Sequence, residues 1–234
     1  MPAALSHTSL TLHASAGSLA RTLGRIGDTV RPSTLLIDLD GVLRLWPKEY
    51  SALEKAHDLP LESIGRTAFE PLLLEQVTTG RITDQEWRHE VKRRLAASYP
   101  SSQAEAGVEA WSSPVGSVHQ EVLCLVIGAR VHCRIGLVTN ATDRLSQDLN
   151  ALELAQHLDF VVNSSEVGFS KPNPEIFLRA LTLAGAKPHE ALFIDDTLSN
   201  VLAATALGIQ AHHFTSLASL KTFMQSFGLV TNAA

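Results

Sequence analysis

Short apolar runs alternate with amphipathic segments over much of the chain, and this alternation limits the fold more than any other feature. Apolar runs with the length and composition of buried strands occur at residues 34–39, 134–139, 159–163, 191–195 and 209–214. Each of the last four runs is followed by a segment with helical spacing. Strands that alternate with helices form a parallel sheet with right-handed crossovers and helices on both faces. The sequence therefore predicts an α/β fold built on a doubly wound parallel sheet.

Helical patterns with few strand signals fill the segment between the first apolar run and the second. Helices are expected at residues 49–57, 69–77, 84–98, 103–111 and 118–131. Thr83 and Glu86 form a capping-box pattern at the start of one of these helices. We therefore expect an all-helical insert at residues 47–128, placed inside a sheet domain made of residues 34–46 and 129–234.

The first 33 residues form an N-terminal extension with a different composition. They hold no acid before Asp28, are rich in Ser, Thr and Ala, and carry Arg21, Arg25 and Arg31. Apolar residues recur at helical spacing between residues 15 and 27. Two interpretations fit: a short helix or frayed tail attached to the sheet domain, which we favour, and an amphipathic transit peptide for an organelle.

Composition excludes several classes of protein. Apolar residues make up 45% of the 234 residues and charged residues 18%, which is ordinary for a globular protein. The formal net charge is −5, and the arginine-rich run at 88–94 has acids interleaved, which argues against nucleic-acid binding. No apolar run is long enough to cross a bilayer, and the two cysteines lack the spacing of a zinc site. We expect a cytoplasmic monomer or homodimer that binds neither nucleic acid nor membranes.

Polar residues stand where the predicted strands end, or open a loop beside them. They are Asp38, Asp40, Thr139, Asn140, Lys171, Asp195 and Asp196. Because ligands of open α/β sheets bind beyond the carboxyl ends of the strands, these residues are expected to converge. Four carboxylates in one place repel one another unless a cation neutralises them, and ligands that are all oxygen favour Mg²⁺. A lysine beside them suits an anionic substrate, so the set points to phosphoryl transfer.

The same residues carry a resemblance to a known family. The chain resembles the haloacid dehalogenase (HAD) superfamily of phosphohydrolases in four motifs, in the expected order between residues 34 and 214. These motifs are Asp38-Leu39-Asp40-Gly41-Val42-Leu43, Val138-Thr139-Asn140, Ser170-Lys171-Pro172-Asn173-Pro174 and Phe193-Ile194-Asp195-Asp196. The resemblance implies a Rossmann-like core with a type-1 helical cap, and hydrolysis of a small phosphorylated metabolite with Mg²⁺ as cofactor.

The first motif would supply the reacting groups in such an enzyme. The resemblance implies that Asp38 is the nucleophile that forms an aspartyl-phosphate, and that it also binds Mg²⁺. Asp40 would protonate the leaving oxygen and then activate the hydrolytic water, while its backbone carbonyl would bind the metal. On an extended strand two residues that far apart point to the same side, and the turn at Gly41 can bring the second carboxylate over the substrate.

The other three motifs would hold the phosphoryl group and the metal. By the same resemblance, Thr139 and Asn140 hold the phosphoryl group, and Lys171 holds both that group and the nucleophile. Asp196 would bind Mg²⁺ directly and Asp195 through water, although the reverse order stays open. Some of these residues also stand where helix caps are expected, but capping explains neither the two acids of the first motif nor the lysine.

Substrate and exact reaction stay open at this stage. A phosphomutase that uses the same aspartyl-phosphate and a non-catalytic protein that binds a phosphorylated ligand are the alternatives to a phosphatase. Dehalogenases of this superfamily lack the second acid of the first motif, which this chain has at Asp40. Arg44 or Lys48 would contact the remote part of the substrate or simply carry charge at the hinge of the insert, whereas Trp87 and Trp111 are expected to pack inside it.

Overall fold

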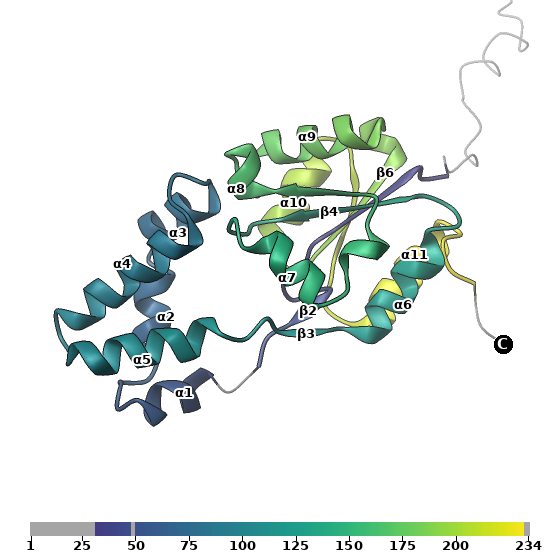
Figure 1. The fold of residues 1–234 in the computed structure, drawn as a ribbon. Helices are drawn as coiled ribbons and strands as arrows, with labels where there is room; N and C mark the ends of the chain where they lie inside the picture. The colour runs from purple at the N-terminus through teal and green to yellow at the C-terminus, as the bar shows by residue number, and fades with distance from the viewer. Residues whose placement is uncertain (1–30, 48–49, 232–234) are drawn as a thin grey trace, which may run out of the picture. The chain divides into compact units, whose positions relative to one another are not determined.

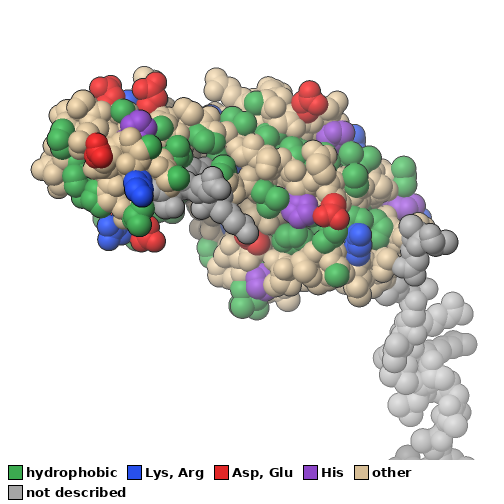
Figure 2. Space-filling model, turned by 90° about the horizontal axis from the view of Figure 1, so that it is seen from below, with side chains coloured by type: hydrophobic (Ala, Val, Ile, Leu, Met, Phe, Trp, Pro, Cys, Tyr) green, Lys and Arg blue, Asp and Glu red, His purple; other side chains and the backbone are tan. Residues whose placement is uncertain are grey.

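The computed structural model describes residues 31–47 and 50–231. The predictions made for residues 1–30, and the alternatives for Lys48, therefore lie outside the described residues. No helix in the described ranges is both long enough and apolar enough to cross a membrane. On the face shown in Figure 2, acidic and basic side chains are scattered rather than gathered into one patch.

A five-stranded parallel sheet forms the centre of the fold, in the order β5-β4-β1-β6-β7 (Figure 1). Its strands are β1 Thr34–Ile37, β4 Arg134–Thr139, β5 Phe160–Asn163, β6 Ala191–Asp195 and β7 Gln210–His213. All pairs of neighbouring strands are parallel. All five strands lie where the sequence predicted them. Strand β1 lies in the middle, so the residues that follow it are flanked by the ends of β4 and β6.

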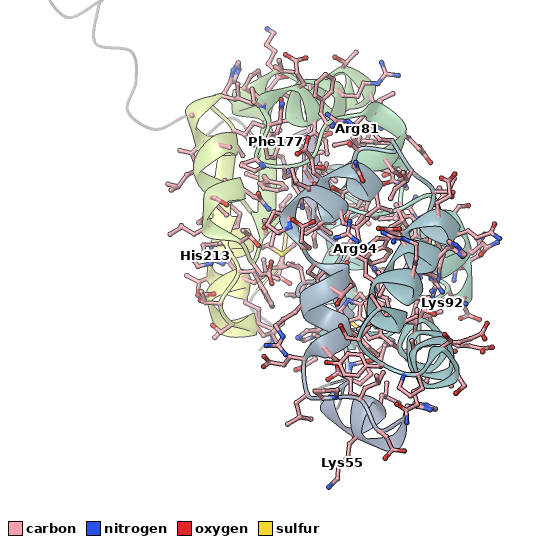
Figure 3. All side chains as sticks on the ribbon, turned by 90° about the vertical axis from the view of Figure 1, so that its left-hand side faces the viewer. Lys55, Arg81, Lys92, Arg94, Phe177 and His213 are labelled. Atoms are coloured by element: carbon pink, nitrogen blue, oxygen red, sulfur yellow. The ribbon has the colours of Figure 1, made fainter. Side chains whose placement is uncertain are left out.

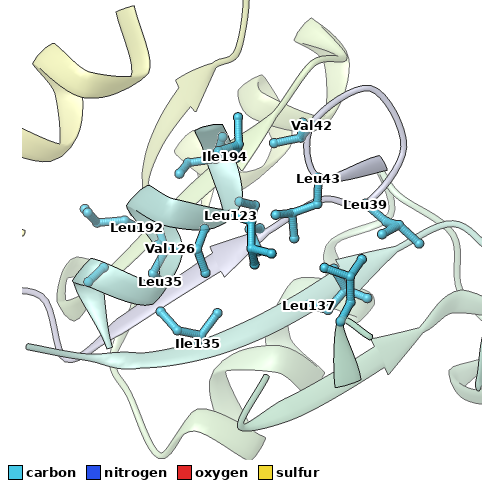
Figure 4. Packing of buried hydrophobic residues seen from close by; sticks show 14 of the residues in the cluster. Leu35, Leu39, Val42, Leu43, Leu123, Val126, Ile135, Leu137, Leu192 and Ile194 are labelled. Carbon is cyan, nitrogen blue, oxygen red and sulfur yellow. The ribbon is translucent and has the colours of Figure 1, made fainter. Parts of the chain in front are cut away.

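Helices cover both faces of this sheet, as expected for a doubly wound fold. Alternate residues of β1 belong to different buried clusters: Leu35 and Ile37 to one, Leu36 to the other. The first cluster contains buried side chains of α6 Gln120–Ala129, α7 Leu145–Ala151 and α11 Leu217–Ser226. Figure 4 shows Leu123 and Val126 of α6 beside Leu35 and Ile135 of the sheet. The second contains those of α9 Pro174–Ala184 and α10 Leu198–Ala206. Short helices complete the layers at α8 Ser164–Val167, η2 Ala155–His157 and η3 Pro188–Glu190.

Besides α6, the predicted insert contains five helices within the described residues. They are α1 Tyr50–Ala56, α2 Ser63–Ala68, α3 Pro71–Thr78, α4 Asp84–Ala96 and α5 Ser101–Ser112. Helices α2 to α5 share a buried cluster of their own that includes Trp87, with Trp111 packed against it, so both tryptophans pack as predicted. The capping box is also present, since the Thr83 hydroxyl accepts from the Glu86 N–H and the Glu86 carboxylate accepts from the Thr83 N–H. Basic side chains such as Lys55 and Lys92 project outward from these helices (Figure 3).

Two short strands join the insert to the sheet domain. Strand β2 Arg44–Leu45 leads into the insert and pairs antiparallel with β3 Ser117–Val118, which leads out of it. Helix α6 follows β3 directly, and its buried side chains belong to the cluster that covers the sheet. We propose a division into a sheet domain and a helical cap, and this packing groups α6 with the sheet domain.

Candidate active site

Asp38 stands one residue beyond β1 and continues the pairing of that strand. Its N–H donates to the carbonyl of Ile194 at 2.9 Å, which fixes the residue beside the end of β6. Its side chain is buried, with 7% of the residue exposed, and Oδ1 accepts from the N–H of Leu39 at 2.7 Å. The chain then turns sharply, because the N–H groups of Leu43 and Arg44 both donate to the Leu39 carbonyl.

The turn passes close to Asp196 and requires glycine at position 41. Gly41 has φ +80°, a conformation that residues with a side chain rarely adopt. A Cβ added there would lie 1.9 Å from Asp196 Oδ2. The glycine therefore lets the first and fourth motifs approach one another.

Lys171 links the ends of three strands. Its Nζ lies 2.7 Å from Asp38 Oδ1 and 2.7 Å from Asp195 Oδ2, and it donates to the Val138 carbonyl at 2.8 Å. Asn140 holds the backbone of this lysine: its Nδ2 donates to the Lys171 carbonyl at 2.9 Å, and its Oδ1 accepts from the Lys171 N–H at 2.7 Å. The Asn140 side-chain amide therefore positions the lysine. The contact with a phosphoryl group that was predicted for Asn140 is then left to the backbone of Asn140.

Asp195 and Asp196 differ sharply in their surroundings. Asp195 is fully buried, and its carboxylate accepts from the Thr197 N–H at 2.8 Å and from Asn200 Nδ2 at 3.1 Å, besides its contact with Lys171. Asp196 is exposed to the cleft. One ring nitrogen of His213 lies 2.9 Å from the Asp196 carbonyl, a contact that the sequence did not indicate.

Three carboxylates meet at this point. Oxygen atoms of Asp38, Asp195 and Asp196 all lie within 4.8 Å of one another. Burial, opposed by the charge of Lys171 and helped by that of Asp195, raises the pKa of Asp38 from its usual value to about 7. Burial and Asp195 also raise the pKa of Asp196. A lysine neutralises only one of the three charges, so the donor set fits a hard divalent cation bound by oxygen.

Asp40 lies on the other side of the turn, in a different set of contacts. Its Oδ1 accepts from Arg44 Nε at 2.7 Å and from Trp46 Nε1 at 2.7 Å, and its Oδ2 accepts from Arg44 at 2.9 Å. Arg44 is nearly buried, and its third donor reaches Asp148 Oδ2 at 2.9 Å. Burial would lower the pKa of Arg44, but the hydrogen bonds and charges of the two aspartates raise it.

A cleft of about 650 Å³ brings most of the predicted residues together. Its lining includes Asp38, Asp40, Thr139, Asn140, Lys171 and Asp196, with Trp46, Thr197 and Asn200 added by the structure. Asp195 lies below this lining, joined to it through Lys171. Asn200 stands one helical turn after the fourth motif, and its Nδ2 donates to Asp195 Oδ1 at 3.1 Å. Nothing in the sequence pointed to Trp46 or Asp148, because their contacts depend on the fold.

Several known proteins are similar to this chain in sequence. The sequence model of the haloacid dehalogenase-like hydrolase family matches residues 32–208. The bifunctional epoxide hydrolase 2 of Mus musculus is 29% identical over 196 residues, which is 74% of this chain but 34% of the mouse protein. The chain thus spans about a third of the length of that relative. The phosphoglycolate phosphatase 1 of Pseudomonas aeruginosa is 27% identical over 197 residues, covering 76% of this chain and 68% of the relative.

Solved structures include an enzyme of the same family. A crystal structure of a HAD family enzyme from Bacteroides thetaiotaomicron has a TM-score of 0.62 and 25% identity, and covers 77% of this chain and 92% of that one. A mutant of that enzyme was solved in complex with magnesium and inorganic phosphate, with a TM-score of 0.59. The family match covers well over half of the chain and includes all four motifs of the candidate site. The protein therefore belongs to the haloacid dehalogenase-like hydrolases.

Proposed function

We propose that this hydrolase is a Mg²⁺-dependent phosphatase that releases phosphate from a small phosphate monoester, with Asp38 as nucleophile. The observation that carries the proposal is the position of Lys171 Nζ, 2.7 Å from both Asp38 Oδ1 and Asp195 Oδ2, beside the exposed Asp196. This arrangement gathers a carboxylate nucleophile, a fixed cation and oxygen ligands for a metal at one strand edge. A phosphoryl group carries the opposite charge to the lysine and the metal, and would be drawn to this edge.

Asp38, Asp196 and the carbonyl of Asp40 are the proposed direct ligands of Mg²⁺. Asp195 is fully buried and its carboxylate already accepts three different donors, which favours an indirect role through water. The exposed Asp196 has the freedom to bind a cation directly. When bound, Mg²⁺ would neutralise charge on the phosphoryl oxygens and on the clustered carboxylates. The magnesium and phosphate complex of the Bacteroides enzyme supports magnesium as the cofactor.

The reaction would proceed in two displacements at phosphorus. In the first, a carboxylate oxygen of Asp38 forms a bond to phosphorus while the bond to the ester oxygen breaks, and Asp40 gives that oxygen its proton. In the second, Asp40 takes a proton from water, and the water oxygen attacks phosphorus and displaces Asp38. Lys171 would stabilise the charge on the phosphoryl oxygens, while the backbone of Asn140 and the hydroxyl of Thr139 donate hydrogen bonds to them.

A phosphate-release screen tests this proposal. Wild type and Asp38→Asn would be compared on a panel of phosphorylated metabolites with Mg²⁺, and again with the metal chelated. Asp58→Asn is the matched control, because Asp58 is an exposed residue of the cap that stands outside the cleft. We expect release by wild type and by the control variant in the presence of Mg²⁺ only, and no release by Asp38→Asn.

Three results would count against the proposal in different ways. Equal release by wild type and Asp38→Asn would remove Asp38 as the nucleophile. Activity that required a bisphosphate activator and yielded an isomer would indicate a phosphomutase. Binding of phosphorylated ligands without turnover, on any member of the panel, would indicate a non-catalytic binding protein.

A further inference from the structure

A second cavity, of about 760 Å³, adjoins the catalytic cleft. The two hollows share Asp40, Trp46 and Asn140 in their linings. The cap contributes one side of this cavity through α2, α4 and α5, and the sheet domain contributes the other through Ala141 and Leu145. The group proposed to protonate the leaving oxygen therefore stands on the boundary between the two hollows.

Most of the surface of this cavity is apolar, although charged side chains also reach its wall. Phe69, Trp87 and Trp111 form one cluster, with ring centroids 5.4 to 6.2 Å apart. Leu74 and Val77 of α3 extend the same wall. Phe69 keeps 53% of its surface exposed although it touches both tryptophans. A large apolar side chain that remains this exposed beside a cavity favours an apolar ligand there.

Most charged side chains around the cavity are already paired with protein groups. Arg144 Nε donates to Asp148 at 2.8 Å, and its two other nitrogens donate to the carbonyls of Ser112 and Pro114. Arg88 Nε lies 2.6 Å from Asp84 Oδ2.

Three carboxylates on the wall are engaged in the same way. Asp40 and Asp148 both pair with Arg44, and the buried Glu54 accepts the N–H groups of Glu62 and Ile64. The exposed Glu62 and Arg66 are the charged lining residues that face solvent. A charged or sugar-like ligand would find few polar groups here that are not already engaged by the protein.

We propose that this cavity holds the alcohol half of the substrate, and that this half is an uncharged, predominantly apolar alkyl or aryl group. The inference rests on the proposed phosphatase function, since it places the phosphoryl half in the adjoining cleft. The ester oxygen then lies between the two halves, next to Asp40. The substrate class is accordingly a phosphate monoester of an apolar alcohol.

Gly65 provides a way to block the cavity without disturbing the protein. It lies within α2 and lines the cavity, and a Cβ added to it would meet no protein atom within 4 Å. A leucine there would occupy space in the cavity and would favour the helix over glycine. Gly128 of α6 is the matched control, because it is also helical and open to an added Cβ but stands outside the cavity.

The test compares n-alkyl phosphates from ethyl to octyl, with glucose 6-phosphate as the polar substrate. For wild type with Mg²⁺ we expect kcat/KM to rise about threefold for each methylene until the chain fills the cavity. Glucose 6-phosphate should be used less well than hexyl phosphate. The ratio of kcat/KM for octyl over ethyl phosphate should fall by about tenfold or more in Gly65→Leu and stay unchanged in Gly128→Leu.

A binding measurement separates this inference from the proposed function. Calorimetry on the Asp38→Asn protein with Mg²⁺ should show tighter binding of octyl than of ethyl phosphate, and Gly65→Leu in that background should remove the difference. If no ester is hydrolysed but this binding pattern appears, the phosphatase proposal fails and the cavity assignment stands. If phosphate is released without a preference for chain length, or if Gly65→Leu and Gly128→Leu behave alike, the cavity assignment is overturned. Absence of both release and binding overturns both.

Discussion

The carboxylate of Asp40 and the guanidinium of Arg44 face one another through two parallel hydrogen bonds, of 2.7 and 2.9 Å. The remaining donor of Arg44 reaches Asp148, which also accepts from Arg144 at 2.8 Å. Arg144 in turn donates to the Ser112 carbonyl at the end of α5. The proposed acid and base is thus connected, through a chain of charged groups, to the segment by which the polypeptide leaves the cap.

Replacing Arg44 with lysine should weaken this chain of contacts. A lysine places one point charge where the planar guanidinium serves two carboxylates, so either Asp40 or Asp148 loses its partner. We expect Arg44→Lys to lower the free energy of unfolding by about 2 kcal/mol, measured by denaturant unfolding at neutral pH. The exposed Arg93 pairs with Glu90, and Arg93→Lys should leave the free energy of unfolding almost unchanged. Equal losses in the two variants would contradict this account of Arg44.

Removing the charge of Lys171 should disable the site. Lys171→Gln keeps a hydrogen-bond donor but leaves the carboxylates of Asp38 and Asp195 without their shared cation. We expect kcat for phosphate release to fall by about 100-fold or more, as for other groups that stabilise charge in the transition state. Lys187→Gln, at an exposed position outside the cleft, serves as the control. A kcat within a few-fold of wild type in Lys171→Gln would rule out the charge-stabilising role.

Much of this fold was predictable from local patterns. The strand positions followed from apolar runs, and the start of α9 followed from Asn173 and Pro174, where the Asn173 side chain accepts the Glu175 N–H as a cap. The start of α4 followed from the Thr83 capping box. Helix α2 was not predicted, because it is only six residues long and begins after Glu62 in a left-handed conformation. Signals this short do not stand out from the surrounding sequence.

Only those residues of the candidate site that stand at the ends of strands could be predicted from the sequence. Parallel strands bring their carboxyl ends to one edge, so the convergence of Asp38 and Asp195 could be expected. The pairing of Arg44 with Asp148 joins residues 104 positions apart, and no local pattern encodes it. The engagement of the Asn140 amide with the Lys171 backbone likewise depends on how two loops meet. The cavity beside the cleft is lined by residues from far apart in the sequence, such as Phe69 and Leu145, and has no motif of its own.

Gly41→Ala should damage the metal site and not merely the backbone. Both Gly41 and Gly168 have φ near +80°, but an added Cβ collides with Asp196 only at Gly41 and meets nothing within 4 Å at Gly168. We expect each alanine variant to lose about 1 kcal/mol of stability from backbone strain, since both positions require the same left-handed conformation. Only Gly41→Ala should also lose Mg²⁺ affinity, measured by calorimetry. Equal Mg²⁺ affinity in the two variants would contradict the close approach of the two motifs.

The protonation of His212 should make the protein less stable in mild acid. Burial lowers the pKa of His212 from its usual 6.5, and the neighbouring His213 lowers it further. As the pH falls through the unfolded value, the unfolded chain takes up the proton first, so stability is lost below about pH 6.5. In His212→Phe the ring that stacks on Phe223 is kept but the titration is removed. The free energy of unfolding of wild type should therefore fall more steeply than that of the variant between about pH 7 and pH 5.5.

The exposed His189 provides the comparison for this measurement. His189→Phe removes a histidine of the same domain that is not packed against an aromatic ring in the described structure. If the pH dependence of unfolding changed by the same amount in His189→Phe and His212→Phe, the assignment to the partly buried ring of His212 would be wrong.

The nucleophilic role of Asp38 can be tested most directly by a crystal structure with Mg²⁺ and beryllium fluoride, which mimics a phosphoryl group on a carboxylate. The account predicts density for the fluoride complex bonded to an Oδ atom of Asp38, close to Lys171 Nζ, with a metal ion in contact with Asp38 and Asp196. Density bonded to Asp40 instead, or an unmodified Asp38 in crystals that contain both reagents at saturating concentration, would contradict it.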